Sequence, residues 1–118
     1  MQALGIHHVS INVSDVDAAL AFYTETLGLS VRSDRPAFSF GGAWLDVGGQ
    51  QIHLIAGATP DNLGQHLALQ VGDLAATVAE LRSKGIEVTD PSPVGPGLQS
   101  FLVDPCNNAV ELYQRVGS

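Results

Sequence analysis

Apolar and polar residues alternate along residues 4–13, and this period of two predicts a β-strand. The apolar positions that follow fall at helical spacing: Val16, Leu20, Tyr23 and Leu27. They predict an amphipathic helix that is capped by Ser14 or Asp15 and ends at Gly28. Three short strand candidates follow, at residues 29–33, 43–47 and 51–55. The first half of the chain therefore predicts the order β-α-β-β-β.

The second half of the chain repeats this order. Its expected elements are a strand at residues 65–71, a helix at 73–84 and strands at 86–89, 98–103 and 109–114. Leu74, Val78 and Leu81 share one face of the helix, and Gly85 ends it. Prolines make residues 91–96 an expected loop. The expected single domain covers residues 1–118, with module 1 at about 1–57, a linker at 58–64 and module 2 at about 65–116.

The two halves are related by a constant offset in sequence. The separation from His8 to His66 equals that from His53 to Glu111, since 66 − 8 = 111 − 53. One helix covers only one face of a four-stranded sheet, and two modules that face each other across a cavity would cover the other face of both. We therefore expect an α+β fold in which two βαβββ modules form a cup-shaped sheet around a central metal or ligand cavity.

These four repeat-related side chains are the candidate metal ligands. We expect His8, His53, His66 and Glu111 to lie within strands and to point into the cavity, because side chains on a strand alternate between its faces. Three imidazoles and one carboxylate suit one divalent ion, such as Zn²⁺, Ni²⁺, Co²⁺, Mn²⁺ or Fe²⁺. Such an ion could stabilise the enediolate of a small oxygenated substrate, with Glu111 or His53 moving the proton.

Six further residues are candidates for the substrate pocket: Arg35, Phe40, Trp44, Ser10, Gln70 and Phe101. Ser10 and Gln70 share a strand face with His8 and His66, respectively, by even spacing. The aromatic residues either line the pocket or simply pack on the sheet. His7 is expected to face away from His8.

The composition narrows the classes of partner. A formal charge of −7 with five Lys and Arg residues argues against nucleic acid and anionic membranes, and favours a small-molecule substrate or ligand. No apolar run reaches the roughly 18 to 20 residues that span a bilayer, and no leader segment is evident, so we expect a cytoplasmic protein. Cys106 is the only cysteine, which excludes an intramolecular disulfide and a thiolate-rich metal site.

Four segments resemble the vicinal oxygen chelate superfamily, which includes glyoxalases, bleomycin-resistance proteins and extradiol dioxygenases. They are His8-Val9-x-Ile11-x-Val13-x-Asp15, Gln51-Ile52-His53-Leu54, His66-x-Ala68-Leu69-x-Val71-x-Asp73-Leu74, and Phe101-x-x-Asp104-Pro105 with Val110-Glu111-Leu112. The resemblance implies paired βαβββ modules, usually in a homodimer with the cup completed at or near the interface. It also implies a divalent metal at the positions of His8, His53, His66 and Glu111.

The chain departs from the family pattern at three places. Position 53 typically holds Glu or Gln in glyoxalase I, so Glu111 is the one remaining carboxylate ligand. Asn107 stands in the final turn where a Gly is usual, and Asn tolerates left-handed dihedrals. A glutathione site usually needs cations, and only Arg32 and Arg35 are expected near the mouth of the cup.

Three functions are compatible with the resemblance and these departures. The first is a metal-dependent lyase or isomerase of glyoxalase type, which the full set of four ligands favours. The second is a drug- or metabolite-binding protein without turnover, similar to bleomycin-resistance proteins. The third is an Fe²⁺ dioxygenase of extradiol type, in which His53 would crowd the two-His, one-carboxylate triad.

Overall fold

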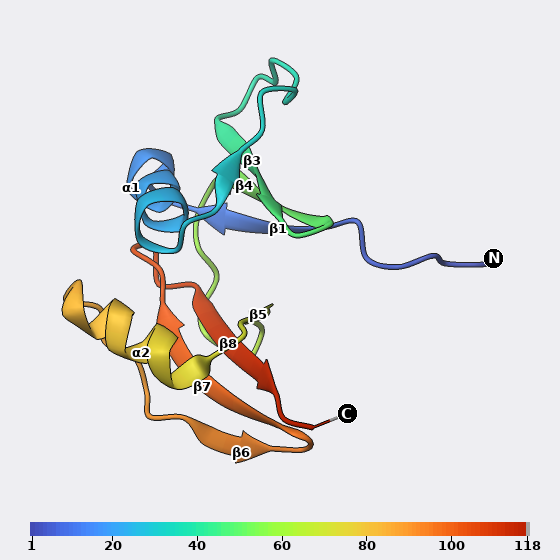
Figure 1. The fold of residues 1–118 in the computed structure, drawn as a ribbon. Helices are drawn as coiled ribbons and strands as arrows, with labels where there is room; N and C mark the ends of the chain where they lie inside the picture. The colour runs from blue at the N-terminus through green and yellow to red at the C-terminus, as the bar shows by residue number, and fades with distance from the viewer. Residues whose placement is uncertain (118) are drawn as a thin grey trace. The chain divides into compact units, whose positions relative to one another are not determined.

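The computed structural model describes residues 1–117 (Figure 1). The chain divides into two compact units, Met1–Asp61 and Asn62–Ser118. Each unit is a four-stranded mixed sheet with one α-helix, so the predicted α+β class and the predicted βαβββ order of each module are confirmed.

Unit 1 has its strands in the order β1-β4-β3-β2. Its elements are β1 (His8–Val13), α1 (Val16–Ala21), the π-helical turn η1 (Phe22–Thr26), β2 (Ser30–Val31), β3 (Gly42–Val47) and β4 (Gln50–Ala56). β1 and β4 pair in parallel, while β3 pairs antiparallel with β4 and with β2. The helix α1 packs against β3 and β4 and covers one face of the sheet.

Unit 2 has the equivalent strand order, β5-β8-β7-β6. Its elements are β5 (Leu67–Gln70), α2 (Leu74–Ser83), β6 (Ser92–Val94), β7 (Gly97–Val103) and β8 (Ala109–Arg115). β5 and β8 pair in parallel, and the remaining pairs are antiparallel. The helix α2 packs against β7 and β8.

The sequence repeat is visible in the helix ends. Asp15 and Asp73, which are related by the same offset as the candidate ligands, each cap a helix by accepting a hydrogen bond of 3.0 Å from the amide N–H three residues further on. Gly28 and Gly85 follow the two helices with φ angles of 80° and 82°, in the left-handed region that glycine adopts without strain. The two modules therefore share their local signals as well as their strand order.

Alternation along the strands places an apolar face of each sheet against its helix. The most deeply buried large side chains include Leu45, Leu54 and Val13 in unit 1, and Leu74, Leu112 and Val110 in unit 2. The opposite face of each sheet, which we call the open face, carries the residues between them. The candidate ligands His53 and Glu111 lie on the open faces, since their neighbours along the strand point to the core.

The prediction of a strand at residues 86–89 is wrong. These residues form no strand, and β6 lies instead at Ser92–Val94, inside the expected proline-rich loop. The segment is held by single bonds rather than by a ladder: Arg82 donates to the carbonyl of Val88 at 2.6 Å, and the amide of Phe101 donates to the hydroxyl of Thr89 at 2.8 Å. Pro93 is tolerated in β6 because β6 is an edge strand.

Other expected elements differ in extent, and the strand expected at residues 29–33 is limited to Ser30–Val31. The strand expected at residues 4–13 begins at His8, and the strand expected at residues 65–71 is limited to Leu67–Gln70. The helix expected to reach Leu27 is α-helical only to Ala21 and continues as η1, where the Leu27 amide bonds to the carbonyl of Phe22, five residues back. Because β5 begins only at Leu67, His66 precedes its strand rather than lying within it.

The final turn, which carries Asn107, lies at residues 104–108 and is built around a buried carboxylate. Asp104 is 3% exposed and accepts hydrogen bonds from the amides of Cys106 and Asn108, at 2.8 and 2.9 Å, and from the Asn108 side chain at 3.0 Å. Asn107 takes a φ of 68°, the left-handed conformation expected of it. This turn connects β7 to β8 and so fixes the strand that carries Glu111.

Replacing Asp104 by Ala should lower the free energy of unfolding by about 2–4 kcal/mol, because the buried amide of Cys106 and the half-buried amide of Asn108 lose their acceptor. Urea unfolding followed by circular dichroism measures this loss. Asp90→Ala is the matched control, since Asp90 is exposed and pairs only at the surface with Arg82; its effect should stay within about 0.5 kcal/mol. Equal effects of the two substitutions would contradict this role of Asp104.

Candidate functional site

The open face of unit 1 carries a stack of three rings that follows the strand order. In the sheet register, His53 of β4 is opposite Trp44 of β3 on one side and Ser10 of β1 on the other. The His53 ring lies 4.0 Å from the His8 ring at 13°, and 4.3 Å from the Trp44 ring at 9°, measured between centroids. The two stacked rings leave His53 only 7% exposed, although His53 lies on the open face.

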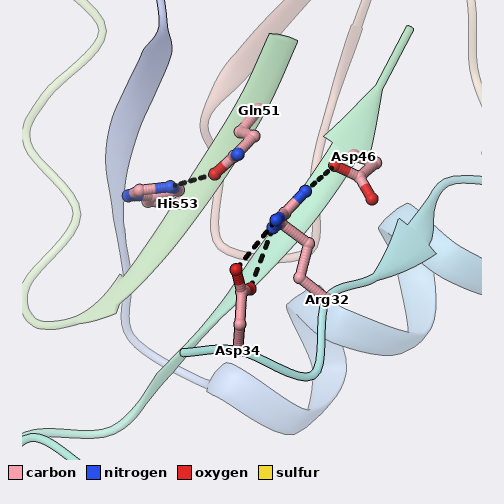
Figure 2. A network of polar contacts seen from close by, with 5 residues as sticks. All are labelled: Arg32, Asp34, Asp46, Gln51 and His53. Carbon is pink, nitrogen blue, oxygen red and sulfur yellow. Dashed lines mark hydrogen bonds and ion pairs between the residues drawn. The ribbon is translucent and has the colours of Figure 1, made fainter. Parts of the chain in front are cut away.

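The protonation of His53 is set by its neighbour on the same strand. Its Nε2 lies 2.8 Å from Oε1 of Gln51 (Figure 2). Because an amide oxygen only accepts hydrogen bonds, Nε2 carries the proton and Nδ1 keeps its lone pair. Burial, followed by the nearby positive charges of His8, His7, Arg32 and Arg35, lowers the pKa of His53 below its usual 6.5. The ring is therefore held in the neutral form that a metal ion requires.

The expectation that His7 faces away from His8 is wrong. The Nδ1 atoms of the two rings are 2.9 Å apart, and the rings meet edge to face at 5.2 Å. His7 lies just before β1, where the chain is not a strand, so the alternation rule does not apply to it.

Unit 2 brings its two candidate ligands into direct contact. His66 Nε2 lies 2.9 Å from Oε1 of Glu111, and His66 Nδ1 lies 2.9 Å from the carbonyl oxygen of Gly64. The hydrogen bond to Gly64, with the carboxylate of Glu111 as a further cause, raises the pKa of His66 above 6.5. Phe101, opposite Glu111 in the register, places its ring edge 5.5 Å from the His66 ring.

The pair in unit 2 fits one side of a divalent metal site. A metal-binding His commonly donates its other N–H to a backbone carbonyl, as Nδ1 of His66 does to Gly64. Two nitrogen or oxygen ligands about 2.1 Å from one ion and at right angles to each other are about 3 Å apart, close to the separation of the His66 and Glu111 atoms. In the described part of the chain, no three His, Cys, Asp or Glu side chains gather as a metal site. The set of four ligands, contributed in pairs by two units, stays a prediction.

Arg35 and Phe40, two of the pocket candidates of unit 1, form a cluster with Phe38, which the sequence did not single out. The Arg35 guanidinium lies 5.0 Å from the Phe38 ring centroid and 5.6 Å from that of Phe40, and donates to the Phe40 carbonyl at 2.9 Å. Trp44 lies in the ring stack described above. Ser10 is exposed on the edge strand β1.

Arg32 is fully committed to carboxylates. It bonds Asp34 at 2.8 and 2.9 Å and Asp46 at 2.7 Å (Figure 2). These two partners raise the pKa of Arg32 well above its usual range, and Arg32 in turn lowers the pKa of Asp34. Arg32 therefore offers little charge to a substrate.

In unit 2, a pocket of about 400 Å³ lies beside Phe101, lined by residues 87–89, residues 101–103 and Ala109. Phe101 therefore touches both this pocket and the His66 ring. Gln70 is exposed at the end of the edge strand β5. Sequence reasoning missed two site residues: Gln51, which even spacing from His53 could have indicated, and Phe38, which lies between strands where no periodicity points to it.

Within residues 1–117, no helix has the length and apolar character needed to cross a membrane.

The fold of the two units agrees with comparisons to known proteins. Residues 5–112 match the Glyoxalase/Bleomycin resistance protein/Dioxygenase superfamily. The chain belongs to this superfamily, which confirms the resemblance drawn from the sequence.

Several relatives of this chain carry the name lactoylglutathione lyase. This chain is 31% identical to the "Probable lactoylglutathione lyase, chloroplastic" of Arabidopsis thaliana, over 92% of this chain but only 35% of that protein. The chain thus spans about a third of the length of this plant relative. It is also 31% identical to the "Probable lactoylglutathione lyase" of Synechocystis, over 91% of this chain and 92% of that one.

Two examples illustrate the solved structures that share this fold. A protein of the glyoxalase family from Bacillus anthracis is 28% identical with a TM-score of 0.86, over 98% of both chains. TnmS3, an antibiotic binding protein from Streptomyces, is 26% identical with a TM-score of 0.79, also over 98% of both chains. Membership of the superfamily is therefore established. The relatives and solved structures include proteins named as a lyase and a protein described as antibiotic binding.

In the metal-free protein, we expect His66 to titrate above pH 6.5 and His53 below it, for the causes given above. Imidazole chemical shifts followed by NMR through a pH titration measure both values. In the Glu111→Gln variant the pKa of His66 should fall but remain raised, because the hydrogen bond to Gly64 is the larger cause. A His53 that titrates above His66 would contradict this description of the two environments.

Proposed function

We propose that this protein is a metal-dependent lyase or isomerase of glyoxalase type that acts on a small oxygenated metabolite. Support comes from the superfamily, from the bacterial relative of similar length and from the donor set. The observation that carries the proposal is the His66–Glu111 pair, in which a backbone carbonyl orients the imidazole toward a carboxylate on the open face.

In this proposal, His8, His53, His66 and Glu111 hold one divalent ion of the Zn²⁺, Ni²⁺, Co²⁺, Mn²⁺ or Fe²⁺ group. When bound, the ion would supply Lewis-acid stabilisation of the negative charge of an enediolate. The Glu111 carboxylate, half-buried beside Phe101, takes the proton from the substrate carbon and returns it. Neutral His53, held by Gln51, is the second group able to move a proton.

The second candidate function is binding of a drug or metabolite without turnover. The flat stack of His8, His53 and Trp44 favours it, since stacked rings offer contact area without any catalytic group. The 26% identity to the antibiotic binding protein TnmS3 adds support. Metal content and turnover distinguish the two functions.

We also propose that the chain forms a homodimer, as the family resemblance implies. Light scattering coupled to size-exclusion chromatography should give about twice the 12.3 kDa mass of the chain. A monomer at micromolar concentration would contradict this proposal without affecting the ligand set.

Purified protein should contain about one divalent ion per chain by elemental analysis, as four protein ligands imply. His53→Ala and Glu111→Ala should each weaken metal binding by at least about tenfold, because each removes one ligand. Glu80→Gln is the matched control, since Glu80 lies on the surface of α2 and pairs only with Lys84; it should retain the ion. No metal in the wild type after incubation with each candidate ion would leave the binding function as the alternative.

Turnover should be screened with hemithioacetals, acyl-thioesters and epoxides. Glu111→Gln should lower the rate by about a hundredfold or more, because the carboxylate that moves the proton is lost. If Glu111→Gln left both metal binding and turnover unchanged, the assigned role of Glu111 would be wrong.

A further inference from the structure

We infer that the open face of unit 1 binds a planar aromatic molecule that carries one anionic group, with its ring between Trp44 and Phe38 and its anion at Arg35. As a statement of substrate class, this inference rests on the proposed function. As a statement about binding, it is independent of any metal.

The first argument is the order of the rings across the sheet. The His8, His53 and Trp44 rings follow the strands β1, β4 and β3, and neighbouring rings are nearly parallel. The remaining neighbour of β3 is β2, and the segment between β2 and β3 carries Phe38 and Phe40. These two rings are also parallel to each other, at 4.9 Å and 9°.

The second argument is the one break in this series. The Phe38 and Trp44 ring centroids are 6.3 Å apart and the planes are tilted by 52°. Each ring already has a parallel partner on one face, His53 for Trp44 and Phe40 for Phe38. A ring inserted between two others needs about 7 Å between their planes, because carbon atoms in contact are about 3.5 Å apart. The present separation is shorter than this, so the Phe38–Phe40 pair, which lies in a segment with no regular secondary structure, must shift outward by about 1 Å and turn by about 50° to admit one aromatic ring and complete the stack.

The third argument is the exposure of the two phenylalanines. Phe38 is 42% exposed and Phe40 44% exposed, in a segment with no regular secondary structure. The apolar core of unit 1 lies on the other face of the sheet, so these rings are not needed to fill it. Exposed aromatic rings beside a positioned polar group, here the Arg35 guanidinium, are typical of a binding surface.

The charge of the ligand follows from the two arginines of unit 1. Arg32 is neutralised by Asp34 and Asp46. Among the described residues, no carboxylate forms an ion pair with Arg35, whose guanidinium is held in place by the Phe40 carbonyl and by the two phenylalanine rings. A positioned guanidinium without a carboxylate favours an anion.

The same arginines argue against two other ligand classes. A cationic ligand would have to compete with Arg32 for the carboxylates of Asp34 and Asp46. A glutathione adduct carries two carboxylates, and only Arg35 is available in unit 1 to receive them. An aromatic compound with a single acidic group satisfies both the ring gap and the one available cation.

Trp44 is the only tryptophan in the chain, so its indole N–H signal in an NMR spectrum reports on the site alone. The probes are 4-nitrobenzoate, its neutral analogue 4-nitrobenzyl alcohol and the non-aromatic anion cyclohexanecarboxylate, each titrated into metal-stripped wild-type protein. We expect 4-nitrobenzoate to bind about tenfold more tightly than cyclohexanecarboxylate, the gain of one additional aromatic stack. We expect it to bind roughly fivefold more tightly than the alcohol, the gain of one charged hydrogen bond.

Two variants separate the two contacts. Phe38→Leu should remove the preference for the aromatic acid over cyclohexanecarboxylate, and Arg35→Gln should remove the preference for the acid over the alcohol. Phe38→Tyr keeps the ring and should bind as the wild type does. Arg115→Gln is the control for general charge, because Arg115 is an exposed cation of unit 2. Amide dispersion in the same spectra shows that each variant is folded.

Equal binding of the three probes, no indole shift at millimolar probe, or unchanged binding in both Phe38→Leu and Arg35→Gln would overturn the inference. Because the protein is metal-stripped, these outcomes do not depend on the metal site. Binding of the aromatic acid by a protein that takes up no metal would support this inference and contradict the proposed function. Metal binding and turnover without any response to the aromatic acid would do the reverse.

Discussion

The parallel pairing of the first and last strands is the constraint on which the rest of each unit depends. β1 pairs with β4 and β5 with β8, and each pair needs a crossover long enough to return the chain in the same direction. That crossover contains the helix, which covers one face of the sheet and leaves the other open. The division into a core face and an open face is then fixed by the two-residue period of the strands, residue by residue.

This constraint places equivalent positions at equivalent points of the two sheets. Ser10, His53 and Trp44 are aligned across unit 1 in the same way that Ala68, Glu111 and Phe101 are aligned across unit 2. The chemistry at these points differs. In unit 1 the central residue is an imidazole between two parallel rings, whereas in unit 2 it is a carboxylate bonded to an imidazole. One module thus offers an aromatic surface and the other a hydrogen-bonded imidazole and carboxylate.

The internal repeat made most of this fold predictable. Helix caps, terminating glycines and strand alternation are local signals, and each appears twice in the structure, as the caps Asp15 and Asp73 show. The predictions that failed concern features that depend on tertiary contacts rather than on local sequence. Residues 86–89 have the composition of a strand but are anchored by Arg82 from α2 and by Phe101 from β7, contacts that only the tertiary structure provides. Likewise, nothing in the spacing of Phe38 indicates that it stacks on Phe40 and approaches Trp44.

The identity of residue 53 links the metal ligands to the aromatic surface. The family resemblance implies Glu or Gln at this position. Here a carboxylate would lie 7% exposed between the rings of His8 and Trp44, where its charge would lose most of its hydration. A neutral imidazole instead stacks on both rings, and its N–H is satisfied by Gln51. His53 therefore offers an imidazole in place of a carboxylate as a possible proton carrier, and it extends the ring stack from β3 to β1. In the proposed function, Glu111 is then the only carboxylate among the four proposed ligands, and a substrate that approaches His53 meets an aromatic surface rather than a second acidic group. The flat aromatic ligand inferred for unit 1 fits this surface better than a flexible peptide thiol does.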